Sequence, residues 1–238
     1  MLISQTSFLG ALHWWSFERI ADASGKISAP EETQISMHRI RTIVPFLFQA
    51  INSLYIATRR IPTPWTTNTE MPVKTGGTRG LYISLNIDPE NYLLLRAILA
   101  LTGDVHLCCK SLTTHRLLEL KAPVKKLLVN TKDFYEVRSF FTHFDEVLST
   151  PLKHGISGAT KTNCGIEYTS SAKECRHLVL VRDKIHFSYR QRAAEADISK
   201  SAFNAIFESA RLIYTEVISH KVHAQTCHYL HADKLYPL

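Results

Sequence analysis

The feature that most constrains the fold of this chain is an apolar spacing of three and four residues that recurs over long segments. Such spacing places side chains on one face of an α-helix, because the helix turns once every 3.6 residues. Two stripes show it best: Ile40, Val44, Leu47, Ile51 and Leu54, and Phe203, Ile206, Ala210, Ile213 and Val217. These stripes predict amphipathic helices that pack through one face.

Capping residues predict where the helices begin. Asp88, Pro89 and Glu90 combine an N-cap, a proline for the first helical position and an acid near the positive end of the helix dipole. Asn130 and Asp133 form a similar start. Pro45 is expected to kink its helix. We therefore predict helices over residues 11–23, 28–54, 88–101, 104–120, a short stretch after Pro123, 132–148 and 199–220.

Residues 62–87 and 177–189 differ from this helical pattern. The first segment carries three prolines and three glycines, which stop helices, and predicts a loop or linker. The second has two β-branched and aromatic runs around Arg182, Asp183 and Lys184, which predicts a β-hairpin. The fold class is then mostly α, an up-down helical bundle with a small hairpin before the last helix. The expected organisation is an N-terminal helical segment 1–61, a linker 62–87, a bundle 88–221 and a C-terminal tail 222–238.

The composition indicates a soluble, basic protein. Among 238 residues, 28 are Lys or Arg and 21 are Asp or Glu, which gives a net charge of +7 and favours nucleic acid as a partner. The five cysteines form no Cys-x-x-Cys pair and fit reduced thiols in the cytoplasm. The most apolar run, residues 43–57, is interrupted by polar residues and is shorter than the ~20 residues of a membrane span. No membrane association is expected.

Arg138 and His143 are the candidate catalytic residues. They are separated by four residues within the segment predicted as a helix over 132–148. Metal-independent RNA cleavage needs a base near neutral pKa for the 2′-hydroxyl and a cation for the phosphorane oxygens, and His and Arg supply these groups. Five residues on an ideal helix correspond to a rotation of about 500°, so the two side chains point about 140° apart. Either an irregular turn or a second protomer is needed to complete the site.

Here the sequence resembles the HEPN superfamily of helical-bundle proteins, whose signature is Arg, four to six residues, then His. The string from Phe141 through His143 to Glu146 is similar to the aromatic and acidic surroundings of that His. Ser139 departs from the common pattern, in which a polar amide or acid follows the Arg. The resemblance implies a metal-independent endoribonuclease that needs no cofactor, acts as a homodimer and leaves a cyclic phosphate. It also implies a toxin or host-defence setting, with an antitoxin partner for a toxin.

Basic residues on either side of the pair could track an RNA backbone. The candidates are Lys125, Lys126, Arg176, Arg182, Lys184, Arg190 and Arg192. The alternative interpretation is a solvated basic face, with Arg138 paired to Asp133, Glu136 or Asp145 and His143 packed among aromatic residues. On that interpretation the protein is a non-catalytic bundle that binds nucleic acid or another protein.

A third class of function is metal binding near the C-terminus. His220, His223, Cys227 and His231 recur every three or four residues and would line one side of a helix. Their span of about 16 Å exceeds one coordination shell, so Cys164, Cys175 or His177 would have to complete the site. A polar C-terminal tail explains the same residues more simply, and no metal site is predicted.

Overall fold

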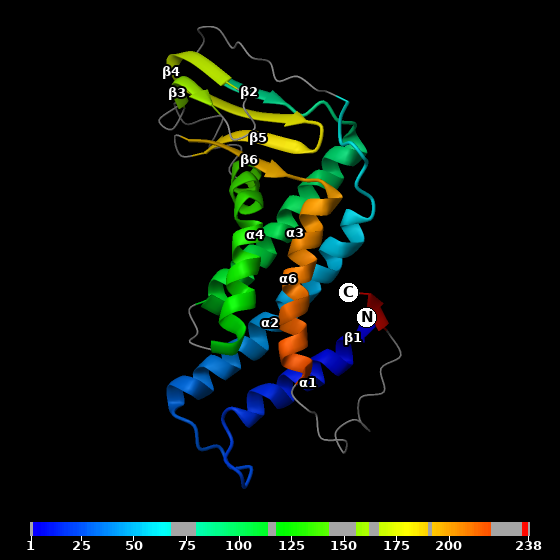
Figure 1. Ribbon diagram of the computed structural model, residues 1–238, viewed down its shortest axis with the longest axis vertical. Helices are drawn as coiled ribbons and strands as arrows, with labels where there is room; N and C mark the ends of the chain where they lie inside the picture. Colours follow the sequence, from blue (N-terminus) through cyan, green and yellow to red (C-terminus); the bar gives the residue numbers. More distant parts are fainter. Residues whose placement is uncertain are drawn as a thin grey trace. The chain divides into compact units, whose positions relative to one another are not determined.

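The computed structural model describes residues 2–67, 80–113, 118–142, 156–161, 167–189, 192–219 and 235–237. This part of the chain is mostly helical, with a small, mostly antiparallel sheet before the last helix (Figure 1). Its helices are α1 (Gln5–Glu18), α2 (Glu31–Thr58), α3 (Pro89–Thr113), α4 (Leu118–Thr142) and α6 (Lys200–Ser219). Its strands are β1 (Leu2–Ser4), β2 (Gly80–Ser84), β3 (Ile156–Lys161), β4 (Glu167–Val181), β5 (Lys184–Tyr189), β6 (Arg192–Asp197) and β7 (Leu235–Pro237).

The predicted helix starts agree with α3 and α6 and differ for α4. The Asp88 carboxylate accepts a hydrogen bond from the Asn91 main-chain N–H at 2.9 Å, as an N-cap should. The predicted segments 88–101 and 104–120 are instead one helix to Thr113. Likewise α4 runs without a break through Pro123 and Asn130. Pro123 lies close enough to the start of α4 that its missing N–H removes one main-chain hydrogen bond near the helix end.

The predicted hairpin is the centre of a five-stranded sheet. β4 and β5 pair around the turn at Arg182 and Asp183, and β6 pairs antiparallel with β5. β2 pairs in parallel with the C-terminal half of β4, and β3 pairs with β4 near its N-terminal end. β2 lies inside the segment predicted as a loop, so that expectation is wrong for residues 80–84. The strand hydrogen bonds that hold β2 come from residues about 95 positions later in the chain.

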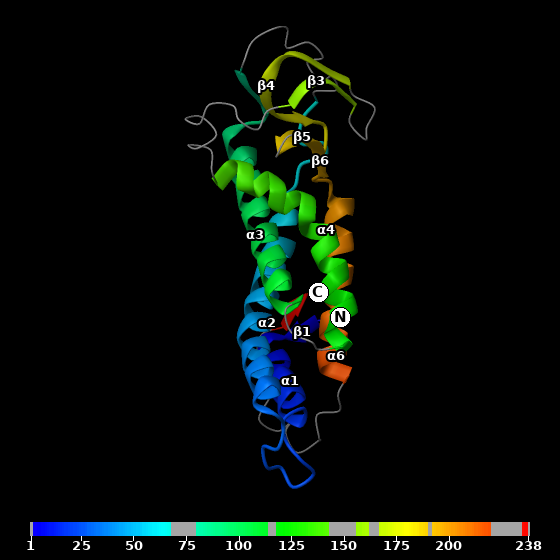
Figure 2. The ribbon, with the colours of Figure 1, turned by 90° about the vertical axis from the view of Figure 1, so that its left-hand side faces the viewer.

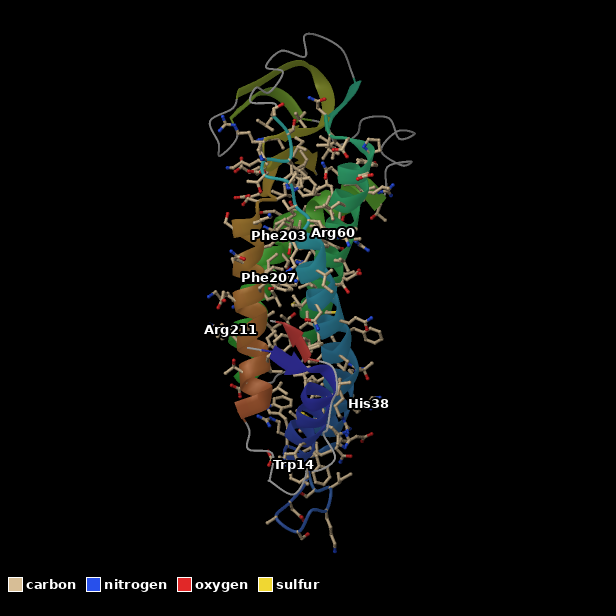
Figure 3. The ribbon with its side chains drawn as sticks, turned by 90° about the vertical axis from the view of Figure 1, so that its right-hand side faces the viewer. Trp14, His38, Arg60, Phe203, Phe207 and Arg211 are labelled. Atoms are coloured by element: carbon tan, nitrogen blue, oxygen red, sulfur yellow. The ribbon has the colours of Figure 1, made fainter. Side chains whose placement is uncertain are left out.

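The contacts divide the chain into two compact units. The first contains residues 1–56, 104–131 and 204–238. Its core includes a cluster of three buried rings: Phe8 and Phe48 stack with centroids 4.6 Å apart, and Tyr214 contacts both edge-on. On α6, whose residues Phe203, Phe207 and Arg211 follow one another in Figure 3, Phe207 packs against Tyr55 with centroids 5.3 Å apart.

The second unit contains residues 57–103 and 132–203, which include β2 to β6. Ile185 and Phe187 of β5 are fully buried, and Phe134 of α4 packs against Phe203 of α6 with centroids 5.1 Å apart. Helices α2, α3, α4 and α6 each contribute residues to both units. The sequence-based boundaries at residues 61, 87 and 221 stay a prediction.

Within the described residues, two helices, α2 and α3, are long and apolar enough to cross a membrane by length and composition alone. In each, 44% of the most apolar window is buried inside the protein. Core helices of soluble proteins pass the same test, so this observation adds little to the location predicted from the sequence.

Candidate functional site

Arg138 lies in the last turns of α4, and its side chain is half-buried. The neighbouring hydroxyls are bound by the helix itself: Ser139 donates to the Tyr135 carbonyl and Thr142 donates to the Arg138 carbonyl, both at 3.0 Å. His143 follows the last described residue of α4 and lies outside the described residues. The structure therefore places one member of the predicted pair, and the position of the other stays a prediction.

The Arg138 side chain lies directly against Gly103 of α3. A Cβ added to Gly103 would lie 2.0 Å from Arg138 Cδ and 2.7 Å from Nε. Figure 2 shows the last turns of α4 beside α3, within the second unit. Glycine inside a helix costs about 1 kcal/mol relative to alanine, and here it leaves the room that the arginine stem occupies. The sequence did not indicate this contact, because it depends on which faces of α3 and α4 meet.

The predicted RNA-binding residues occur in both units. Lys125 and Lys126 are exposed on α4 in the first unit. Arg182 and Lys184 lie together on the β4–β5 hairpin in the second unit. The remaining candidates are Arg176 within β4, Arg192 at the start of β6, and Arg190, which lies outside the described residues.

The β4–β5 turn is anchored by the segment that follows α2. The Trp65 main-chain N–H donates to the Asp183 carboxylate at 3.1 Å, and the indole N–H donates to the Ile198 carbonyl at 2.8 Å. Figure 1 shows this segment beside the turn. Arg182 is exposed at the tip with φ of 52°, a left-handed conformation that favours glycine. Arg182 is thus presented to solvent on an anchored turn.

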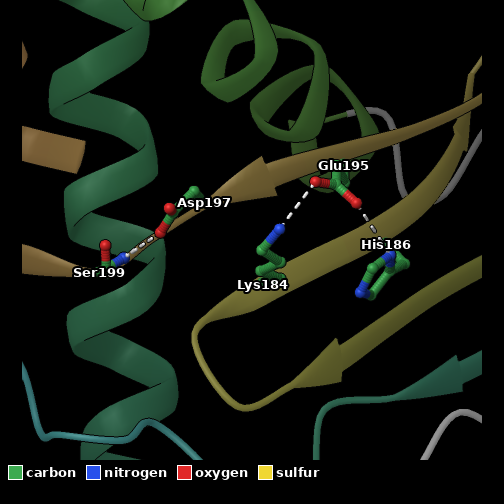
Figure 4. Close-up of polar contacts among 5 residues, drawn as sticks. All are labelled: Lys184, His186, Glu195, Asp197 and Ser199. Carbon is green, nitrogen blue, oxygen red and sulfur yellow. Dashed lines mark hydrogen bonds and ion pairs between the residues drawn. The ribbon is translucent and has the colours of Figure 1, made fainter. Parts of the chain in front are cut away.

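A charged cluster lies next to that turn on the paired strands β5 and β6 (Figure 4). Lys184 Nζ and Glu195 Oε1 are 3.0 Å apart, and His186 Nδ1 lies 3.8 Å from the other Glu195 oxygen. His186 is buried, and this burial lowers the pKa of its imidazole although Glu195 opposes the shift. The Glu195 carboxylate offsets the Lys184 charge, which leaves Arg182 as the more available cation of the hairpin.

A second buried imidazole, His106, joins α3 to α4 in the first unit. Its Nδ1 lies 3.1 Å from the Thr131 hydroxyl, which itself donates to the Leu127 carbonyl at 2.9 Å. The His106 ring and the Thr131 hydroxyl therefore form one buried polar contact between the two helices. Burial, and then the nearby Lys110 charge, lower the pKa of His106 below its ordinary value of 6.5.

We expect acid to destabilise the protein through these two imidazoles. Both have a folded-state pKa below the unfolded value, so the unfolded chain binds more protons as the pH falls below about 6.5. The free energy of unfolding should therefore decrease over that range. Thermal melts between pH 7.5 and 5.5 measure the effect, and His106→Gln should show a smaller decrease in melting temperature. An identical pH dependence in wild type and variant would contradict this role of His106.

The described part of the chain does not support a metal site or a nucleophilic cysteine. No group of three or more His, Cys, Asp or Glu residues there could hold a metal ion. Burial raises the pKa of the Cys108 and Cys109 thiols on α3, which disfavours the nucleophilic thiolate. The alternative metal ligands named from the sequence, His220, His223, Cys227 and His231, lie outside the described residues.

Comparisons with known proteins complete these observations. No known protein family, curated protein or solved structure was found to match the chain.

Proposed function

We propose that this protein is a metal-independent endoribonuclease of HEPN type, with Arg138 and His143 as its catalytic residues. The observation that carries the proposal is the position of Arg138, which lies five residues before His143 in the sequence. The aliphatic part of the Arg138 side chain fills the space that Gly103 leaves by having no side chain. An arginine that is held by packing presents its guanidinium with less loss of side-chain freedom when substrate binds. The basic charge of the chain supports RNA as the substrate.

The proposed chemistry needs only these two side chains and the RNA. The His143 imidazole removes the proton of a ribose 2′-hydroxyl, and the resulting oxygen attacks the adjacent phosphorus. The bond from phosphorus to the 5′-oxygen breaks, and that oxygen takes the proton that the His143 imidazolium now carries, which returns the imidazole to its starting form. The products are a 2′,3′-cyclic phosphate and a 5′-hydroxyl end. The planar Arg138 guanidinium binds two phosphate oxygens as their negative charge increases.

The working form in this proposal is a homodimer. On a regular helix the two side chains point about 140° apart. Two copies related by a two-fold axis can instead bring Arg138 of one protomer to His143 of its partner, and the symmetry makes two equal sites. A cytoplasmic toxin or host-defence effector, with an antitoxin partner in the first case, is the biological setting of this proposal.

Cleavage in the presence of a chelator tests the proposal. Purified full-length protein is incubated with a random-sequence single-stranded RNA pool in EDTA, and the product ends are identified. We expect cleavage with cyclic phosphate and 5′-hydroxyl ends, because no step uses a metal. Intact RNA, or products that carry 5′-phosphates, would contradict the proposal.

A non-catalytic RNA-binding protein is the second candidate function. The exposed Lys125 and Lys126 and the anchored, exposed Arg182 favour it, since cations on the surface neutralise phosphates without chemistry. The same RNA pool separates the two functions. A binding protein would retain RNA with an affinity that falls steeply with salt, and the RNA would stay intact.

A further inference from the structure

Tyr92, Arg96 and Gly103 lie along one stripe of α3, at intervals of four and seven residues. Gly103 faces Arg138 of α4, and the Tyr92 ring faces Phe141, one turn after Arg138, with ring centroids 6.3 Å apart. Two side chains three residues apart on α4 therefore reach positions eleven residues apart on α3 within the second unit. Arg96 lies between the two contacts, about 10 Å along the helix axis from Gly103.

The side chains of Tyr92, Arg96 and Phe141 are all at least partly exposed to solvent. Arg96 is exposed, and the Tyr92 and Phe141 rings are only half-buried. The Arg96 guanidinium carbon lies 5.9 Å from the centre of the Tyr92 ring, within the range of a cation–π contact. We name Tyr92, Arg96 and Phe141 the α3–α4 platform. It combines aromatic rings with a cation on the same helix that the Arg138 side chain contacts.

We propose that the α3–α4 platform binds a single-stranded RNA nucleotide that flanks the cleaved linkage, with the base against Tyr92 and Phe141 and a phosphate on Arg96. This inference rests on the proposed endoribonuclease function and names the substrate contacts of the same site. Single-stranded nucleic acid is recognised by stacking of bases on aromatic rings and arginine planes combined with backbone neutralisation. The platform offers both kinds of group in one place.

Acidic groups at the start of α3 do not oppose the phosphate contact strongly. Asp88 caps the helix, with its carboxylate bound by the main chain and side chain of Asn91. Glu90 is in the first turn, where the helix dipole offsets its charge. Leu93, which is 65% exposed on the neighbouring turn, adds an apolar edge.

The test measures RNA binding in the His143→Ala background, in which we expect cleavage to be slow. Binding of a fluorescent single-stranded RNA oligonucleotide is followed by anisotropy at several salt concentrations. Tyr92→Leu keeps an apolar side chain but removes the stacking surface, and we expect affinity to fall about tenfold, since stacking on one ring contributes about 5- to 150-fold. Arg96→Gln should weaken binding and reduce the salt slope by about 0.7, the value for one phosphate of a single strand.

Arg60→Gln is the matched control, because Arg60 is exposed in the second unit but lies outside the platform. Arg60→Gln should bind RNA with the same affinity as the His143→Ala protein, and so about ten times more tightly than Tyr92→Leu. Unchanged affinity in both Tyr92→Leu and Arg96→Gln would overturn the inference, whether or not Leu93→Ser weakens RNA binding. If Tyr92→Leu fails to fold, as a thermal melt shows, the salt slope of Arg96→Gln decides alone.

The outcomes for the platform and for the function are distinguishable. Cleavage that depends on His143 but not on Tyr92 or Arg96 would overturn the platform and keep the nuclease. RNA binding that depends on Tyr92 and Arg96, without any cleavage by the wild-type protein, would support the platform and overturn the nuclease function. With both correct, the two substitutions in the active enzyme raise KM more than they lower kcat, because the platform binds a part of the substrate that does not react.

Discussion

Replacing His143 with alanine is expected to lower the rate of RNA cleavage by about 10²- to 10⁴-fold, the usual contribution of a positioned general base. The imidazole is the one group in the proposed mechanism that accepts the 2′-hydroxyl proton, so its loss removes that step. Single-turnover cleavage of a defined RNA measures the rate. The melting temperature should stay close to that of wild type.

His38→Ala is the matched control for this substitution. His38 is exposed on α2 (Figure 3), and it belongs to the first unit. Its replacement removes one surface imidazole without touching the candidate site, and the rate should stay within about twofold of wild type. Equal activity in His143→Ala and His38→Ala would show that His143 is not the general base.

Replacing Arg138 is expected to have the second-largest effect. Arg138→Ala removes the cation that stabilises the phosphorane oxygens, and removal of one such donor lowers rates by about 10²- to 10³-fold. Arg138→Lys should recover only a small part of this loss, since an ammonium cannot bind two oxygens with a planar fork. Single-turnover rates on the same RNA measure both. Full activity of the lysine variant would contradict a two-oxygen contact.

Gly103→Ala separates the position of Arg138 from its charge. The new Cβ would overlap the Arg138 stem, so the side chain must move. Alanine favours the helix by about 1 kcal/mol, which should keep the fold stable, while a shift of about 1 Å in a catalytic group can cost up to 10²-fold in rate. We expect a tenfold or larger loss in wild type and no further loss in Arg138→Ala. If Gly103→Ala lowered the rate by the same factor with and without Arg138→Ala, the glycine substitution would not act through Arg138.

The elements that sequence predicted well are those specified by local signals. The apolar stripes of α2 and α6 and the Asp88 cap of α3 each lie within a few residues of the feature that predicts them. Strand β6 has no such signal. Its sequence, from Arg192 to Asp197, contains three alanines and no β-branched residue, and it is a strand because β5 offers it a hydrogen-bonding edge.

Asn130 shows why the start of α4 was misplaced. Sequence reasoning treated its side chain as a helix cap, a common use of asparagine. In the structure the Asn130 amide donates to the Ala205 carbonyl at 3.1 Å and to the Ser209 hydroxyl at 3.0 Å. The side chain joins α4 to α6 within the first unit. A polar residue can cap its own helix or bond to another, and only the tertiary structure decides between these uses.

For the candidate site, the sequence indicated Arg138 and His143 by chemistry and spacing. It could not indicate Gly103 or Tyr92, because their relation to Arg138 and Phe141 depends on which faces of α3 and α4 meet. Residues 35 and 49 positions apart in the chain carry no mutual signal in one sequence. The same reason hid the bond between Trp65 and the turn residue Asp183.

The most direct test of the account is cleavage of one RNA beside the same RNA with a single 2′-deoxy nucleotide at the cleaved linkage, both in EDTA. The mechanism uses the 2′-hydroxyl as nucleophile and Arg138 and His143 as its only catalysts. It predicts that the all-ribose strand is cut and the substituted strand stays intact at that linkage. Equal cleavage of both strands, or loss of cleavage on addition of EDTA, would contradict it.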